Sequence, residues 1–289
     1  MLKNTLEIAT PAKINLFLHI TGKRDDGYHE LCSLMCAIGL YDTLQLDLNA
    51  DKLRMVCNHP DVPGDETNLT ARAAKLFLEK LEIEKGIRHP GVSITLVKNI
   101  PVGAGLGGGS SNAAGVLSGL NQLFDYPFSS DRLMAMGLQI GADVPFFIHG
   151  KPAIATGVGE QLQPYDRLRP CTVLLIFPGF PVSTAWVYKN LKLGLTKPRK
   201  QLNYQPFDGL IFQAGRHLNN DLEAVTAEKY EIIDRIKKYL ISSGADGALM
   251  SGSGPTVFGL YSDGQTALDA KANYPDRVDE KIFLANLLL

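Results

Sequence analysis

The residues with the clearest chemical potential are the five glycines between Gly103 and Gly109, which are followed by Ser110 and Ser111. Glycine lets the backbone approach a ligand closely and adopt positive φ, and the first amides of a helix have no internal acceptor. A charge-assisted hydrogen bond from such an amide contributes roughly 1.5–3 kcal/mol, whereas the helix dipole adds about 0.3–1 kcal/mol. The segment therefore predicts a phosphate-binding loop, held mainly by local amide donors, in preference to a flexible surface turn.

The flanking residues predict a strand before this loop and a helix after it. Val92–Val97 alternates apolar and polar residues, as a half-buried strand does. After the loop, apolar residues recur at helical spacing at Ala113, Val116, Leu117, Leu120 and Leu123. Ser110, Ser111 or Asn112 is the expected N-cap of that helix.

Other glycine-rich nucleotide folds fit the sequence less well. A P-loop needs Gly-Lys-Ser/Thr, but Gly109 is followed by two serines and the pair Gly150-Lys151 is followed by proline. A protein-kinase loop would need the Val-Ala-Ile-Lys and His-Arg-Asp segments, which are not in the sequence. The loop does satisfy the dinucleotide fingerprint G-x-G-x-x-G. That fold also needs a second strand ending in an acid, and the candidate Asp125 follows the helix directly with no strand between.

One lysine and one aspartate are candidates for catalysis. Lys13 lies in the alternating segment Leu6–Thr21, on the same strand face as Asn15 and opposite the aliphatic residues. From the sequence alone, a solvent-facing strand position is slightly favoured for this lysine. Asp143 lies in Gly141–Pro145, after a predicted helix. An ordinary turn aspartate and a catalytic carboxylate suit that position equally well.

The rest of the chain predicts mixed strands and helices. Strands are expected at Thr43–Leu48 and Cys171–Phe177, helices at 68–82 and 130–140, and a late helix ending at Gly244 before a strand–loop–strand pattern over Ala248–Tyr261. The polar, proline-containing stretch Lys192–Asp208 predicts an excursion in the second half. A domain boundary is expected near residue 160.

Composition limits the classes of partner. The 289 residues carry a formal net charge of -1, which argues against nucleic acid as the main partner because phosphate backbones need clustered Lys and Arg. No stretch approaches the roughly 18 consecutive apolar residues of a membrane span, and no signal peptide is expected. The four cysteines show no zinc-like spacing, so free thiols in the cytoplasm are expected. A monomer or weak homodimer is expected.

Three separated segments together resemble the GHMP kinase family. Pro11–Leu16 resembles its first motif, Pro101–Ser111 its phosphate-binding second motif, and Ser251–Thr256 its third, a glycine-rich loop that supports the nucleotide site. The resemblance implies a two-domain α+β fold. Residues 1–160 would form the ATP-binding and catalytic domain, and 161–289 a ferredoxin-like domain that closes over the substrate.

Further residues narrow the resemblance to one branch of that family. Lys23–His29, Asn112–Ala114 and Gly141–Phe147 resemble the kinases that phosphorylate the 2-hydroxyl of a cytidine-diphosphate-linked methylerythritol in the non-mevalonate route to isoprenoids. A family member acting on mevalonate, homoserine or a sugar is the nearest alternative, and the Gly27–His29 segment argues against it. A dinucleotide-binding oxidoreductase is the alternative from another class.

The resemblance also implies residue roles. Asp143 would take the proton from the substrate hydroxyl, and Lys13 would lie beside it and the transferring phosphoryl group. A nearby ammonium lowers the pKa of a carboxyl and weakens it as a base, but a loose phosphoryl-transfer transition state needs little early proton removal. Positioning and charge stabilisation are therefore expected to matter more than basicity.

The same resemblance supplies the binding residues. ATP would contact Pro101, Val102, Gly103, Ala104, Gly105, Leu106, Gly107, Gly108, Gly109, Ser110, Ser111 and, in the adenine pocket, Asn68. The substrate would contact Asn15, Tyr28, His29, Thr184 and Tyr188, with Phe180 and Trp186 as alternatives to Tyr188 for stacking on cytosine. Mg²⁺ is expected as the ATP counter-ion without a dedicated carboxylate cage, and a Ser111 contact to it is left open.

Overall fold

The structure is a computed structural model that describes residues 4–191, 211–275 and 277–289. The excursion expected at Lys192–Asp208 lies outside the described residues. The chain forms two compact units that are interleaved in sequence. Unit 1 comprises Met1–Ala12, Tyr41–Val102 and Gly107–Gly150, and unit 2 comprises Lys13–Leu40, Gly103–Leu106 and Lys151–Leu289. The division of roles at residue 160 stays a prediction.

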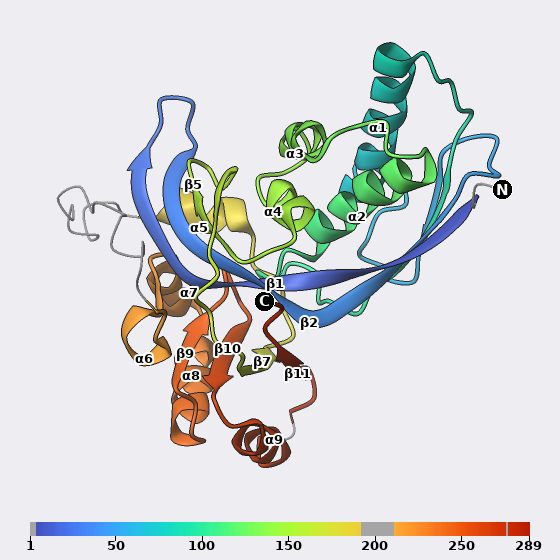
Figure 1. The fold of residues 1–289 in the computed structure, drawn as a ribbon. Helices are drawn as coiled ribbons and strands as arrows, with labels where there is room; N and C mark the ends of the chain where they lie inside the picture. The colour runs from blue at the N-terminus through green and yellow to red at the C-terminus, as the bar shows by residue number, and fades with distance from the viewer. Residues whose placement is uncertain (1–3, 192–210, 276) are drawn as a thin grey trace. The chain divides into compact units, whose positions relative to one another are not determined.

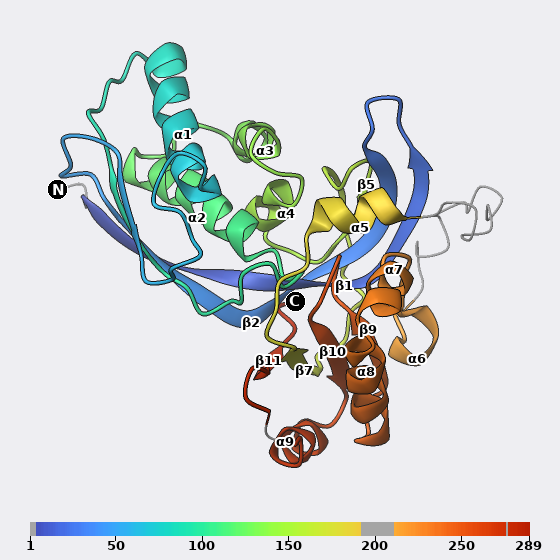
Figure 2. The same ribbon diagram turned by 180° about the vertical axis from the view of Figure 1, so that it is seen from behind.

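The chain contains both strands and helices, as the sequence predicts (Figures 1 and 2). The strands are β1 Thr5–Lys23, β2 His29–Asp47, β3 Arg54–Cys57, β4 Ser93–Val97, β5 Ala153–Thr156, β6 Gln161–Pro164, β7 Thr172–Phe177, β8 Asn219–Asn220, β9 Gly247–Met250, β10 Val257–Tyr261 and β11 Lys281–Asn286. The helices are α1 Leu69–Lys85, α2 Gly108–Leu123, α3 Ser130–Leu138, α4 Val144–His149, α5 Thr184–Asn190, α6 Ala214–His217, α7 Glu223–Lys229, α8 Ile232–Ser242 and α9 Gly264–Ala272.

Unit 1 is a sheet portion covered by helices. Its strands lie in the order β3-β4-β2-β1, with Thr43–Asp47 antiparallel to Ser93–Val97 and β3 parallel to β4. Helices α1 to α4 gather on one side of these strands (Figure 1). One apolar core joins the strand residues Leu44 and Leu46 to Phe77 of α1 and Leu117 of α2.

Helix α1 has clear sequence causes. Asn68 caps it, because its side chain accepts a hydrogen bond from the Thr70 amide at 2.8 Å. Gly86 ends it in the left-handed conformation, with φ of 68°, which glycine adopts without a Cβ penalty. Between the caps, the apolar residues Phe77 and Leu81 are buried one turn apart. The prediction of a helix over 68–82 is confirmed.

Helix α2 begins earlier than the sequence suggested. The prediction of Ser110, Ser111 or Asn112 as its N-cap is wrong, because Gly107 caps a helix that starts at Gly108. The three polar residues instead occupy its first turns. Helix α4, which starts at Val144 directly after Asp143, was not predicted, because its proline suggested an end rather than a first turn.

Unit 2 contains a four-stranded antiparallel sheet in the order β11-β7-β10-β9. Helix α8 precedes β9 in the chain, and α9 connects β10 to β11; the two helices pack with this sheet (Figure 2). This arrangement of strands and crossover helices is ferredoxin-like, as predicted.

The remainder of unit 2 surrounds the hairpin formed by β1 and β2. Ser33–Met35 of β2 pair with β5, and Phe17 and Leu18 of β1 pair with the short strand β8. Beside β8, a small apolar cluster contains Leu18, Val182, Val187 and Leu222. Strand β8 therefore fixes the chain at 219–222 against β1.

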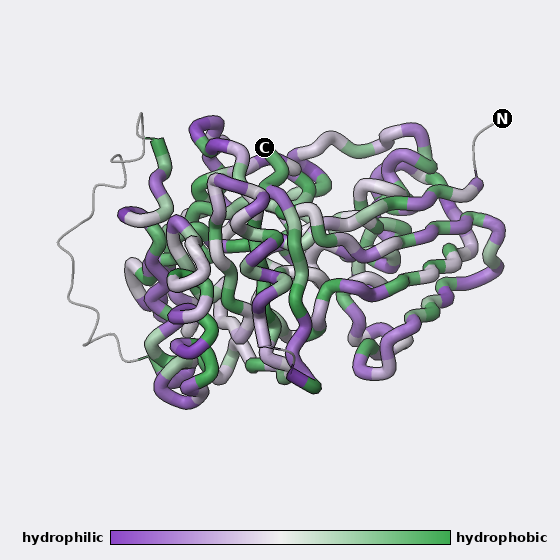
Figure 3. Tube along the Cα trace, turned by 90° about the horizontal axis from the view of Figure 1, so that it is seen from below, coloured by the Kyte–Doolittle hydropathy of each residue, from purple (hydrophilic) through white to green (hydrophobic). Residues whose placement is uncertain are grey.

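Hydrophobic and hydrophilic stretches alternate along the trace (Figure 3). Among the described residues, no helix combines the length and the apolar character that crossing a bilayer requires.

Candidate active site

The glycine loop has an alternating backbone. Gly103, Gly105 and Gly107 have φ of 65°, 77° and 69°, while the residues between them do not have positive φ. Backbones that alternate in this way turn successive N–H groups toward one concave side, where an anion can bind. Space also requires glycine, because a Cβ on Gly105 would lie 2.2 Å from the carbonyl oxygen of Ser251.

The carbonyl groups of this loop are already hydrogen-bonded within the protein, whereas its N–H groups remain available to a ligand. Each carbonyl from Gly103 to Leu106 accepts a hydrogen bond from within unit 2. In chain order the donors are the Val182 amide at 3.1 Å, the Thr256 amide at 3.3 Å, the Ser251 hydroxyl at 2.9 Å and the Lys13 amide at 2.9 Å. The amides from Gly103 to Ser110 donate no hydrogen bond to another described residue. A backbone with engaged acceptors and available donors suits an anion.

The start of α2 also presents backbone donors. The helix has no side-chain cap and no acidic residue in its first turn, so neither kind of group offsets its dipole there. Ser111 lies in that turn, and its Oγ is buried without a hydrogen-bond partner. A buried hydroxyl in this state is able to hydrogen-bond to a ligand atom.

Lys13 is not on a solvent-facing strand position. Only 4% of the residue is exposed, and its Nζ donates to Asn15 Oδ1 at 2.6 Å. Asn15 in turn donates to Ser33 Oγ at 2.8 Å, and Ser33 donates to the Phe17 carbonyl at 2.7 Å. The predicted shared face of Lys13 and Asn15 is confirmed. This chain of hydrogen bonds orients the Asn15 amide so that its oxygen faces the ammonium.

The third glycine-rich segment, Ser251–Thr256, lies against the same lysine. A Cβ built on Gly252 would be 3.4 Å from Lys13 Nζ and 3.2 Å from the Gly105 carbonyl oxygen. Lys13, the glycine loop at Gly105 and the third motif therefore lie close to one another within unit 2. The sequence reveals this meeting only through the resemblance, since the segments are far apart in the chain.

Asp143 lies half-buried at the N-cap position of α4. An ordinary aspartate at that position would cap the helix, but its side chain makes no capping hydrogen bond. Its role in catalysis stays a prediction.

Asp42 is a residue that the sequence did not single out. It is fully buried and accepts hydrogen bonds from the amides of Asn99 at 2.7 Å and Ile100 at 2.8 Å, and from Asn112 Nδ2 at 3.0 Å. It also forms an ion pair with Lys98. One carboxylate thus holds the chain both before and after the glycine loop. A polar residue inside the apolar run of β2 was the available signal.

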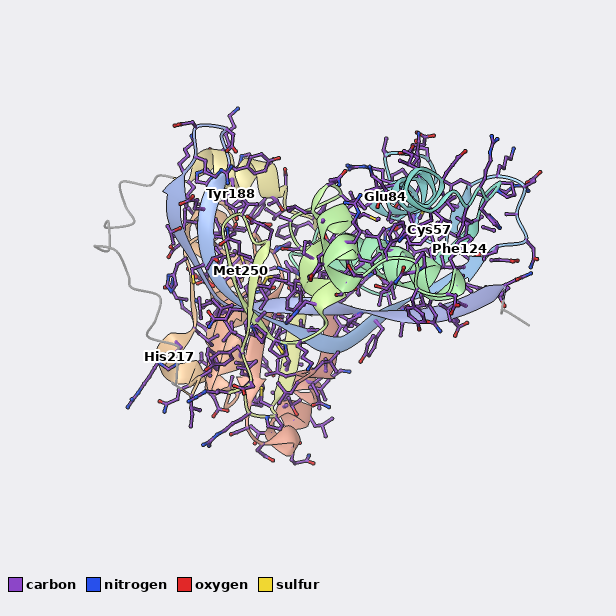
Figure 4. All side chains as sticks on the ribbon, turned by 45° about the horizontal axis from the view of Figure 1, so that its top comes forward. Cys57, Glu84, Phe124, Tyr188, His217 and Met250 are labelled. Carbon is purple, nitrogen blue, oxygen red and sulfur yellow. The ribbon has the colours of Figure 1, made fainter. Side chains whose placement is uncertain are left out.

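The three aromatic residues considered for stacking on cytosine have different neighbours. The rings of His29 and Tyr188 lie 5.2 Å apart with a tilt of 35°. Phe180 packs on Tyr230, and Trp186 lies under the Lys229 ammonium at 4.2 Å. Tyr188 is labelled on α5 in Figure 4. Of the three alternatives, Tyr188 is the one paired with His29.

The remaining predicted substrate and nucleotide residues have differing surroundings. Tyr28 is 64% exposed, at the tip of the β1–β2 hairpin. Thr184 Oγ1 and Ser253 Oγ are 2.8 Å apart, so Thr184 joins the third motif. Asn68 has a structural function, because besides capping α1 it donates to the Pro63 carbonyl at 2.9 Å. Its contact with adenine stays a prediction.

Electrostatics distinguish His29 from its neighbours. Burial lowers the pKa of His29 from its usual 6.5, and the charge of Lys23 lowers it further. The ring is therefore neutral at physiological pH and can both donate and accept a hydrogen bond. Among the described residues, no group of three or more His, Cys, Asp or Glu side chains is placed to hold a metal ion.

Two family models match the sequence. The model described as GHMP kinases N terminal domain matches residues 68–151, and the one described as GHMP kinases C terminal matches residues 203–279.

Similar proteins cover nearly the whole chain. A 4-diphosphocytidyl-2-C-methyl-D-erythritol kinase of Syntrophotalea carbinolica is 46% identical over 274 residues, covering 94% of this chain and 95% of that protein. The enzyme of that name from Syntrophus aciditrophicus is 44% identical, covering 92% and 93%. A crystal structure of a 4-(cytidine 5'-diphospho)-2C-methyl-D-erythritol kinase superposes with a TM-score of 0.78 at 33% identity, covering 98% and 99%. A homoserine kinase of Cytophaga hutchinsonii shares the fold, with a TM-score of 0.74 at 19% identity, covering 99% and 95%.

Proposed function

This chain belongs to the GHMP kinase family, and on that premise we infer that it phosphorylates the 2-hydroxyl of 4-diphosphocytidyl-2-C-methyl-D-erythritol with ATP. It is a small-molecule kinase, and the products are the 2-phosphate and ADP. The reaction belongs to the non-mevalonate route to isoprenoid precursors. A cytoplasmic location and a monomeric or weakly dimeric state stay predictions from the sequence.

The observation that carries the nucleotide site is the one-sided hydrogen bonding of the glycine loop. Its carbonyls from Gly103 to Leu106 are engaged, while its amides and those of the first turn of α2 remain as donors. We assign the ATP polyphosphate to this surface, which Pro101–Ser111 would line. The unpartnered Ser111 Oγ fits a phosphate oxygen or the accompanying Mg²⁺. Most Mg²⁺ ligands would then be phosphate oxygens and waters, and the ion would neutralise phosphate charge.

The cytidine would lie at the His29–Tyr188 pair. Tyr188, and Tyr28 from the hairpin, would stack on the base, which contributes about 1–3 kcal/mol per base without strong selection among bases. The neutral His29 ring would read the hydrogen-bonding edge of cytosine and supply the selectivity. Asn15 and Thr184 would contact the remainder of the substrate.

Catalysis would rest on Lys13 and Asp143. Asp143 would orient the 2-hydroxyl and accept its proton, and the Lys13 ammonium would stabilise charge on the transferring phosphoryl group. The Lys13 ammonium is already oriented by Asn15, so little reorganisation is needed at the moment of transfer.

A coupled assay of ADP release tests the substrate. Turnover with 4-diphosphocytidyl-2-C-methyl-D-erythritol and none with mevalonate or homoserine is the expected result. Preference for either of the latter would move the chain to another branch of the family. Crystals soaked with a non-hydrolysable ATP analogue test the nucleotide site. A triphosphate bound away from the amides of Gly103–Ser110 would overturn that assignment.

A further inference from the structure

The side chain of Asn220 hydrogen-bonds to the third motif, Ser251–Thr256, and to the residue before it. Its Nδ2 donates to the carbonyl of Met250 at 2.8 Å and to the carbonyl of Gly252 at 2.7 Å. Its Oδ1 accepts a hydrogen bond from the Leu222 amide at 3.0 Å. Both amide hydrogens are thus committed to one short segment, and the oxygen fixes which way the side-chain amide is turned.

A second buried side chain adds to this restraint. Thr226 is fully buried, and its Oγ1 donates to the carbonyl of Ser253 at 3.1 Å. The carbonyls of residues 250, 252 and 253 are therefore all engaged by two side chains from the β8–α7 region. None of these three carbonyls belongs to a residue that the nucleotide or substrate assignments use.

The segment restrained in this way lies beside the catalytic lysine. A Cβ on Gly252 would be 3.4 Å from both Lys13 Nζ and Asn15 Oδ1, so the Gly252 backbone lies close to the lysine head. Gly252 has φ of 56°, which only glycine adopts readily. A small rotation of this segment would bring a carbonyl oxygen toward the ammonium, because a backbone carbonyl that loses its donor seeks the nearest one.

We propose that Asn220, assisted by Thr226, is a positioning residue for phosphoryl transfer. It keeps the Gly252 carbonyl engaged, so that this carbonyl does not compete for the Lys13 ammonium and the lysine keeps its orientation toward Asn15. The proposal rests on the proposed function in one respect, namely that Lys13 acts on the transferring phosphoryl group. Asn220 itself touches neither nucleotide nor substrate in this account.

The decisive variant is Asn220→Asp, which has the same shape but places a carboxylate oxygen opposite two carbonyls. With the full-length enzyme, kcat per folded molecule is expected to fall about 10- to 100-fold, as a displacement of about 1 Å near the reacting groups can cause. KM for both substrates is expected to change less than about threefold, because the binding residues are not altered. The loss should be smaller at low pH, where a protonated carboxyl regains one donor.

Asn273→Asp is the matched control. Asn273 caps the exposed end of α9, and its side chain donates to the Asp269 carbonyl at 2.9 Å. The same chemical change there should leave kcat unaltered. Thermal unfolding of both variants gives the folded fraction. Unchanged kcat per folded Asn220→Asp molecule would overturn the proposal, as would a loss of activity with no pH dependence.

A crystal structure of the Asn220→Asp enzyme supplies a readout that does not depend on activity. The Gly252 carbonyl oxygen is expected within about 3 Å of Lys13 Nζ, the length of a hydrogen bond. A segment that stays in its original position would overturn the proposal, even if the wild-type enzyme used a different substrate. Failure of the wild type to phosphorylate the cytidyl substrate would instead count against the proposed function.

If Asn220→Asp does not fold, the variant Thr226→Val tests the same proposal. It keeps the side-chain shape and removes only the hydroxyl donor to Ser253. A several-fold fall in kcat at constant KM would support the proposal, and wild-type kcat would overturn it. If both variants fold, the double variant should lose less than the product of the two single losses, because both side chains restrain one segment.

Discussion

Lys13 is the residue whose surroundings depart most from a simple sequence pattern. Alternation along β1 assigns it to one strand face, yet that face is buried, with the lysine 4% exposed. A buried ammonium is retained only when other groups satisfy it, and Asn15 is one of those groups. Burial also removes water that would screen its charge. The same ammonium can therefore act more strongly on a phosphoryl group than it would at a surface.

Removing either catalytic charge should abolish most turnover. Lys13→Met and Asp143→Asn are each expected to lower kcat about 100-fold or more, as loss of one preorganised charge-stabilising group does. Steady-state ADP release with the cytidyl substrate measures this loss. Affinity for an ATP analogue, measured by calorimetry, should remain close to that of the wild type. Near-wild-type turnover in either variant would remove that residue from the mechanism.

The titration of His29 predicts a pH dependence of substrate recognition. Burial, followed by the Lys23 charge, lowers its pKa below 6.5. The neutral ring is therefore the major form at neutral pH and down to pH 6.5, and the protonated form becomes the major one only at a pH below 6.5. KM for the cytidyl substrate should therefore rise as the pH falls, with the midpoint of the rise below pH 6.5.

The matched variant for this titration is His29→Gln, which cannot titrate. Its KM should be raised at neutral pH, and the further rise in acid should be absent. A KM rise whose midpoint lies above pH 6.5 would contradict the assignment, as would identical profiles for the two enzymes.

The glycine loop is an element whose sequence can be tested one position at a time. Gly105 and Gly86 both have positive φ, 77° and 68°, but a Cβ on Gly105 meets the Ser251 carbonyl at 2.2 Å while a Cβ on Gly86 meets nothing within 4 Å. Gly86→Ala should cost about 1–2 kcal/mol of unfolding free energy, the left-handed penalty alone. Gly105→Ala should cost more and should weaken binding of an ATP analogue. Urea unfolding and calorimetry measure the two effects, and equal costs would contradict the close contact.

The segment that precedes the glycine loop is held in place by the buried ion pair of Lys98 and Asp42. Lys98→Met leaves the Asp42 carboxylate buried without its cation and should lower the unfolding free energy by about 3–5 kcal/mol. Lys75→Met removes the exposed partner of Glu66 and should have little effect. Urea denaturation of the two variants gives the comparison. Similar stabilities would show that Asp42 is held by its backbone and Asn112 partners alone.

The sequence predicted elements better than their junctions. Periodicity located β1, β4, α1 and α3, because these patterns depend on neighbours within a few residues. It misplaced the start of α2, since a glycine in the left-handed conformation can cap a helix with no polar side chain. The hydrogen-bonding roles of Asp42 and Asn220 were not predicted, because their partners at residues 98–112 and 250–252 lie far along the chain.

At the scale of the molecule, the chain crosses between the two compact units several times. Residues Lys13–Leu40 and Gly103–Leu106 belong to unit 2 although they are flanked by unit 1. The domain boundary predicted near residue 160 stays a prediction, and the two compact units interleave along the chain. Resemblance to a family predicts the roles of individual residues. It does not predict which distant segments pair, such as β1 with β8, and this pairing is seen only in the structure.

This interleaving predicts that fragments 1–160 and 161–289 do not fold independently. In the first fragment, Leu18 would lose the apolar neighbours Val182, Val187 and Leu222, and β1 would lose its pairing with β8. In the second, β8 would lose its pairing with β1, and the Asp221 amide would lose the Leu18 carbonyl as its acceptor. Each fragment alone should show no cooperative urea transition by circular dichroism, whereas the full chain should. Co-expression should restore a folded complex, because the missing contacts are non-covalent. A cooperative transition in fragment 1–160 alone would show that unit 1 determines its own structure and that the long hairpin does not need its unit 2 partners.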